Sequence, residues 1–139
     1  MAAFDPSLTY AHEKFATAVD FLVTHPGKIK ERIRLAALEL VLIRTDTVAE
    51  HEEIEKDVKW ILAQVTARDE KHEGEGRITA TLRVMRISKA SDVASRILSV
   101  YLKLEHLVSG VRTDSRRIRV VRSLRVSSTP RRISPRCLR

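Results

Sequence analysis

The densest group of potential metal or acid–base ligands in this chain is the run from Glu50 to Asp57. It contains five carboxylates, one lysine and His51. The ligands of one metal ion have to converge on a point, whereas consecutive residues of a helix diverge by roughly 100° each. We therefore interpret this run as an acidic, solvent-facing helix surface. The sequence predicts neither a metal site nor a bound cofactor.

The other residues with catalytic potential are scattered along the chain. Gly74-Glu75-Gly76 follows no predicted strand and lacks the third glycine of a phosphate-binding loop. The single cysteine, Cys137, lies close to the end of the sequence, and no serine can be paired with a base. We expect no enzymatic activity and no small-molecule substrate. The histidines show no ligand spacing: His12, His25, His51, His72 and His106.

One pair of residues suggests a specific chemistry. Arg44 and His51 are separated by six residues, and this spacing resembles the arginine–histidine pair of all-helical ribonuclease domains of the HEPN type. The resemblance covers these two residues and implies a small ribonuclease in which both side chains meet in one cleft. Arg44 ends one predicted helix and His51 lies inside the next, so we rank this hypothesis third.

The charge of the chain is divided unevenly along its length. The 139 residues carry a formal net charge of +8. Residues 1–109 hold 16 basic and 17 acidic residues, whereas residues 110–139 hold ten arginines and one acid, Asp114. We therefore divide the chain into a nearly neutral domain, 1–109, and a basic tail, 110–139. A chain of this length can bury one modest core.

Apolar residues recur at helical spacing throughout the first 108 positions, and turn residues are few. The periodicity predicts an all-α fold, a four- to five-helix antiparallel bundle, because the connecting loops are short. Asp5-Pro6 is a good start for the first helix, and Thr47-Val48-Ala49-Glu50 has the form of a capping box. The predicted helices are 6–24, 27–44, 47–71, 77–87 and 91–108.

The second helix is apolar around nearly its whole circumference between Leu35 and Ile43. Such a helix has to be covered on all sides, so we expect it at the centre of the bundle, with Leu38 and Leu42 in the core. This stretch is only nine residues long and contains Glu39, so it is too short to span a membrane.

The third helix has an apolar side and a densely charged side. The charged side could dock a basic partner or the chain's own tail. Trp60 lies at the edge of the apolar side, where it is either a boundary residue with a solvated N–H or an anchor for a partner. The candidate interface residues are Trp60, Glu52, Glu53 and Asp57.

The tail combines arginine with β-branched residues and then becomes polar and interrupted by proline. Like charges at this density repel, so we expect it to be disordered or weakly ordered. Arginine binds phosphate well, but no aromatic residue is present for base stacking. A membrane surface is an alternative target, with Ile118, Val121 and Leu124 as weak anchors, and such a tail can also have no function. The candidate polyanion-binding residues are Arg112, Arg116, Arg117, Arg119, Arg122, Arg125, Arg131, Arg132 and Arg136.

These observations rank three functions. The first is a non-enzymatic helical protein-interaction or accessory module, regulatory in role, that binds a protein partner or itself. The second is sequence-independent nucleic-acid binding through the tail, and the third is the small ribonuclease. With one cysteine and no signal-like or transmembrane segment, we expect a cytoplasmic protein.

Overall fold

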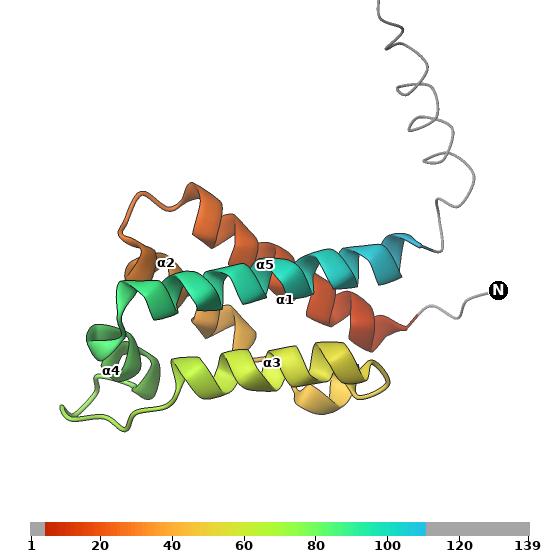
Figure 1. Ribbon diagram of the computed structural model, residues 1–139. Helices are drawn as coiled ribbons and strands as arrows, with labels where there is room; N and C mark the ends of the chain where they lie inside the picture. The colour runs from red at the N-terminus through yellow and green to blue at the C-terminus, as the bar shows by residue number, and fades with distance from the viewer. Residues whose placement is uncertain (1–4, 111–139) are drawn as a thin grey trace, which may run out of the picture.

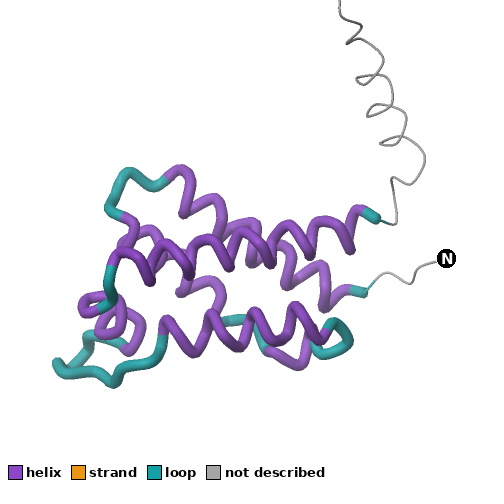
Figure 2. The backbone as a smooth tube through the Cα atoms, viewed as in Figure 1, coloured by secondary structure: helices purple, strands orange, loops and turns teal. Residues whose placement is uncertain are grey.

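A computed structural model describes residues 5–110 of the chain. Within this range the protein is helical and contains no strand, which confirms the all-α prediction (Figure 1, Figure 2). The predicted basic tail lies outside the described residues, apart from Gly110. The elements are α1 (Pro6–Thr24), α2 (Ile29–Leu40), the short 3-10 helix η1 (Thr45–Val48), α3 (Glu52–Val65), α4 (Arg77–Val84) and α5 (Ile87–Ser109).

The helices form a bundle around α5. Helix α1 packs along both α2 and α5, while α3 packs against α5 from another side (Figure 1). The colours of Figure 1 show that α5 runs antiparallel to α1 and to α3. The short α4 lies at the end of the bundle where the chain returns from α3 to α5. No helix in residues 5–110 is long and apolar enough to cross a bilayer.

Helix α1 begins where the sequence predicts. The Asp5 carboxylate accepts a hydrogen bond from the Ser7 backbone N–H at 2.9 Å, and Pro6 occupies the first helical position. Both features satisfy or remove amide groups that have no partner inside the helix. The predicted apolar stripe of α1 faces the core, with Ala11, Phe15 and Ala18 buried.

The core is aliphatic apart from Phe15 and Met85. Its buried members extend from Ala11 to Leu104, so every one of them lies inside α1–α5 or the turns between these helices. The largest side chains that are completely buried are Phe15, Ile33, Leu40, Ile61, Ile97 and Leu104.

The prediction that Leu38 and Leu42 lie in the core is wrong. Helix α2 ends at Leu40, because the amides of Leu42 and Ile43 bond three residues back and tighten the last turn. This tightening carries Ile43 into the core at 4% exposure but leaves Leu38 at 46% and Leu42 at 56%. The bundle is too small to cover this helix on all sides, and α5 takes the central place instead.

The predicted third helix, 47–71, is also too long at both ends. The Thr47 hydroxyl donates to the Arg44 carbonyl at 2.6 Å within η1, so it does not form the predicted capping box. The turn buries Val48, and α3 begins only at Glu52. At the other end, the Thr66 hydroxyl donates to the Leu62 carbonyl at 2.6 Å where the helix ends. A threonine that bonds back in this way competes with helix continuation.

The break between the last two helices lies earlier than predicted. The chain leaves helical geometry at Met85, whose backbone is extended and whose side chain is buried. Ser88, Ser91 and Asp92 are of types that favour helix caps, but they lie inside the first turns of α5 with exposed side chains. On the opposite side of these turns the core residues Ala90 and Val93 pack, and this packing overrides the weak local preference for a cap.

The two neighbouring leucines Leu40 and Leu42 give a direct test of this packing. Leu40→Ala should lower the free energy of unfolding by about 2–5 kcal/mol, because its side chain is 1% exposed. Leu42→Ala should change it by no more than about 0.5 kcal/mol, since that side chain is mostly in solvent. Urea denaturation followed by circular dichroism measures both. Equal costs for the two variants would contradict the placement of the end of α2.

Candidate functional site

Helix α3 is held to the bundle along one side. Its apolar residues recur at helical spacing, so that Ile54, Val58, Ile61 and Val65 are all buried. Asp57 lies at the edge of the same side, about one turn after Ile54, and this carboxylate residue is only 8% exposed. A charged group at this depth needs partners that satisfy it.

Two basic residues of α5 supply these partners. Arg96 Nη1 donates to Asp57 Oδ1 at 2.6 Å, and Lys103 Nζ donates to Asp57 Oδ2 at 3.0 Å. Both carboxylate oxygens are thus occupied, and the two cations lie almost two helical turns apart on α5. The three residues join α3 to α5 across the polar border of their apolar contact.

These contacts set the protonation of Asp57. Burial alone would raise the pKa of the carboxyl group, but the hydrogen bonds from Lys103 and Arg96 and their positive charges outweigh it. The net effect is a pKa below the ordinary value of 3.8. Asp57 is therefore a carboxylate throughout the neutral range, and its role is structural rather than that of an acid catalyst.

Trp60 lies one turn beyond Asp57 and faces the same part of α5. The Arg96 guanidinium carbon is 4.7 Å from the centre of the indole ring, and the Lys89 ammonium nitrogen is 5.1 Å from it. Both distances are within the range of cation–π attraction. Arg96 thus contacts Asp57 and Trp60 together, which fixes the orientation of a large, partly exposed aromatic side chain.

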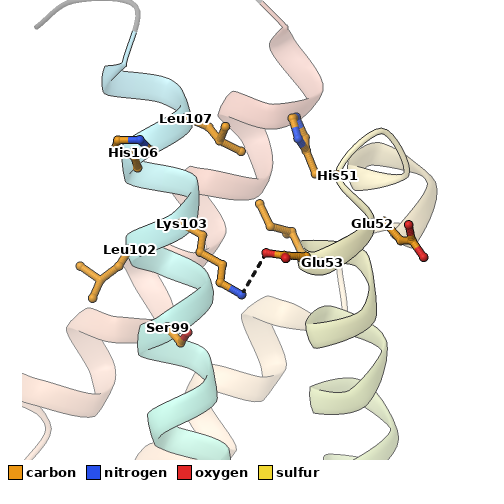
Figure 3. Close-up of a pocket in the computed structure, with 9 residues that line it drawn as sticks. His51, Glu52, Glu53, Ser99, Leu102, Lys103, His106 and Leu107 are labelled. Atoms are coloured by element: carbon orange, nitrogen blue, oxygen red, sulfur yellow. Dashed lines mark ion pairs between the residues drawn. The ribbon is translucent and has the colours of Figure 1, made fainter. Parts of the chain in front are cut away.

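A groove opens between the first turn of α3 and the last third of α5 (Figure 3). Its volume is about 620 Å³. In Figure 3, Lys103 reaches across towards Glu53, with 3.9 Å between the charged atoms, whereas Glu52 points outward on the far side of α3. The lining residues are His51, Glu52, Glu53, Ile54, Ser99, Leu102, Lys103, His106 and Leu107.

A second hollow of about 440 Å³ continues the groove towards the start of α5. The two share Ser99 and Lys103 and together extend along α5 from Asp92 to Leu107. At 1.5 Å per residue this distance is about 22 Å. We call the combined depression the α3–α5 groove. Its length fits four turns of a helix better than it fits a compact small molecule.

The structure places all four candidate interface residues at the α3–α5 groove. Glu52 and Glu53 line its outer end, while Asp57 and Trp60 line the second hollow. The acidic residues differ in exposure. Asp57 is buried and bonded to Arg96 and Lys103, whereas Glu52 and Glu53 are exposed. The nine candidate polyanion-binding arginines, from Arg112 to Arg136, lie outside the described residues.

The structure does not bring Arg44 and His51 into a common cleft among the described residues. His51 precedes α3 and lines the groove, but Arg44 is not among the lining residues. Arg44 Nη2 instead pairs with Asp46 at 2.9 Å, and 81% of its side chain is exposed. Within residues 5–110, no three histidine, aspartate or glutamate side chains gather where they could hold a metal ion.

The α5 side of the groove was missed by the sequence analysis. Leu102 lines the groove beside the small residue Ser99 and is 56% exposed. The signal was present, since Leu102 lies outside the apolar stripe of this helix. The groove itself could not be foreseen, because the register of α3 on α5 is not encoded in local spacing.

Comparisons with known proteins assign no relationship: no family model, curated protein or solved structure matches this chain. The function of the candidate site therefore has to be inferred from its geometry.

The Asp57 cluster predicts a specific dependence of stability on pH. Asp57→Asn should lower the free energy of unfolding by about 1–3 kcal/mol at pH 7, because it weakens two charge-assisted hydrogen bonds and removes the carboxylate that Arg96 and Lys103 share. The native pKa of Asp57 is lowered, so this stabilisation is complete above about pH 5 and declines as the pH falls below 3.8 through the native pKa.

Urea denaturation of both proteins between about pH 2.5 and pH 7 measures this difference. The two stabilities should converge at the acidic end. A difference that stays constant over the whole range would show that the stabilisation does not come from the ionised form of the Asp57 carboxyl group.

Proposed function

We propose that the protein is a non-enzymatic helical interaction module whose α3–α5 groove binds a protein partner. The observation that carries this proposal is that the outer part of the groove combines an apolar floor with charged residues at its edges. Leu102 and Leu107 contribute most of the apolar surface, and Glu52 and Glu53 stand at the outer end. Further along α5 the lining is polar apart from Trp60. Interfaces commonly have this arrangement of an apolar centre and a polar rim.

The chemistry of the groove indicates the class of partner. Ser95 and Ser99 are small and lie between the two helices, so a third helix can approach closely there. An amphipathic helix laid in a groove contacts it through residues three and four apart. The acidic first turn of α3 favours basic residues on such a partner, because opposite charges at the rim steer association.

Trp60 supports the same proposal. Trp is enriched among the residues that contribute most to binding energy. Here the indole is already oriented by Arg96 and Lys89 before any partner arrives, so little conformational entropy is lost when it is covered. We place this interaction in the cytoplasm, and a second copy of the chain is the alternative occupant.

Two exposed leucines provide a matched test of the groove. Leu102 and Leu42 are each 56% exposed, but only Leu102 lines the groove. Amphipathic peptides selected by display against the full chain should bind at least about tenfold more weakly to Leu102→Glu, because a charge would be buried under the peptide. Leu42→Glu should leave the affinity within about twofold.

Fluorescence anisotropy of the labelled peptides measures these affinities. Selected peptides that lose affinity equally for both variants, or a library that gives no peptide dependent on Leu102, would overturn the proposal. Light scattering on the same samples reports whether a second copy occupies the groove.

Binding of nucleic acid or another polyanion through the tail is the second candidate function. It is favoured by the ten arginines and single acid of residues 110–139. Each neutralised phosphate releases counterions, so such binding would be indifferent to sequence and would weaken steeply with salt. The HEPN-like ribonuclease is the third candidate and gains no support from the exposed position of Arg44.

A further inference from the structure

We infer that the chain's own basic segment, residues 116–126, docks in the α3–α5 groove and competes there with the protein partner. The inference rests on the proposed function, since it names a regulator of the same site. Its basis is the position at which the chain leaves the bundle, the reach of the linker, and the charge and apolar pattern of the two surfaces.

The chain leaves the bundle beside the groove. Helix α5 ends at Ser109, and Gly110 follows as its cap, with its N–H donating to the His106 carbonyl at 2.8 Å. His106 and Leu107 line the groove, so its outer end begins only about one turn before the helix ends. Any segment that follows Gly110 therefore starts next to this site.

The linker is long enough to let the segment turn back. Residues 111–115 can span up to roughly 17 Å when extended. The outer part of the groove, from Leu107 to Ser99, is about 12 Å long. A segment beginning at Arg116 can therefore lie along this part without any change in the bundle. Tethering also gives the segment an effective concentration in about the millimolar range.

The charges at the two ends of the groove differ. The outer end carries Glu52 and Glu53, next to the exposed Glu50. Two bases face them: Lys56 pairs with Glu52 at 2.9 Å, and Lys103 lies 3.9 Å from Glu53, so the three carboxylates outnumber the bases by one. At the far end, Arg96 and Lys89 contact Trp60, and the carboxylates of Asp57 and Asp92 line the same hollow, so acids and bases balance there. The excess of carboxylates lies at the outer end, nearest to Gly110, and an arginine-rich segment therefore fits that end better.

The segment also has apolar residues for the groove floor. Ile118, Val121 and Leu124 recur every third residue, and five arginines surround them in the sequence. In a helix, residues at this spacing lie on one side. Leu107, Leu102 and Ile54 offer the complementary apolar surface. The segment thus combines apolar and basic residues, as we propose for the partner, and it belongs to the same chain as the groove.

The chain contains the two probes needed to test this docking. Trp60 is its only tryptophan and Cys137 its only cysteine. An energy acceptor for tryptophan fluorescence can be attached to Cys137 in the full, otherwise unaltered chain. With residues 116–126 docked, 11 residues separate the dye from the groove, and a random coil of that length has a root-mean-square end-to-end distance of about 18 Å. Without docking, 27 residues follow Gly110, and the corresponding distance is about 29 Å.

We expect the efficiency of energy transfer to be at least about twofold higher in the docked chain, because transfer falls with the sixth power of this distance. It should fall when salt is raised from about 0.05 M to about 0.5 M, since the attraction to the glutamates is screened. At low salt, Glu52→Gln/Glu53→Gln should lower it to the high-salt value.

The matched control is Glu13→Gln/Asp20→Asn. It removes two exposed carboxylates from α1, outside the groove lining, and changes the net charge by the same amount. Its energy transfer should equal that of the unaltered chain. Circular dichroism verifies that each variant keeps its helical content.

Three results would overturn the inference. The first is an equal change in both double variants, which would indicate a general effect of charge. The second is an efficiency that depends on protein concentration, which would assign the segment to a second copy. The third is an energy-transfer efficiency that is unaffected by salt and by every substitution and changes only when an oligonucleotide is added. That result would indicate that the tail binds polyanions instead of the groove.

Peptide affinity separates this inference from the proposed function. Replacing Arg116, Arg117, Arg119, Arg122 and Arg125 by Gln in the full chain should strengthen binding of the selected peptides about tenfold, because the competitor is weakened. Equal affinity with and without these arginines would refute docking of the tail while leaving the groove as a partner site. If the affinity of the selected peptides did not depend on Leu102, the groove itself would be refuted as the partner site.

Discussion

The attachment of α3 to α5 is the interaction on which the candidate site depends. The apolar side of α3 packs into the bundle, and the Asp57 carboxylate closes its border by accepting hydrogen bonds from Arg96 and Lys103. Replacing a buried ion pair by apolar residues is often neutral, but removing one partner is costly. The cluster therefore acts mainly by fixing the register of α3 on α5, and that register determines where the α3–α5 groove opens.

The register of α3 on α5 determines both the orientation of Trp60 and the position of the groove. The bonds from Arg96 and Lys103 hold α3 close to the middle of α5, where Arg96 also orients Trp60. Towards the end of α5, no third helix within residues 5–110 covers the space beside Leu102 and Leu107, and the groove results. The exposed leucines at the end of α2 differ from this surface, because Leu38 and Leu42 line neither hollow of the groove. This contrast is why we assign partner binding to α5 and not to α2.

Local sequence signals predicted the helices well and their ends less well. The Asp5 cap and the stripe around Phe15 were sufficient to position α1. The ends of α2 and α3 depended on tertiary contacts instead, since burial of Ile43 and Val48 decided where each turn tightens. Of the candidate site, the α3 residues could be named because acids and Trp60 are conspicuous in sequence. Their partners Arg96 and Lys103 could not, because nothing in local spacing tells which helix faces Asp57.

Nuclear magnetic resonance tests most directly whether the outer end of the α3–α5 groove binds basic amphipathic segments. A synthetic peptide with the sequence of residues 116–126 would be titrated into the ¹⁵N-labelled full chain that carries Gln at Arg116, Arg117, Arg119, Arg122 and Arg125, so that the chain's own segment no longer competes for the groove. The amide signals that move should belong to residues 51–57 and 99–107. Shifts centred on Leu38 and Leu42, or no shifts at any peptide excess, would contradict this expectation.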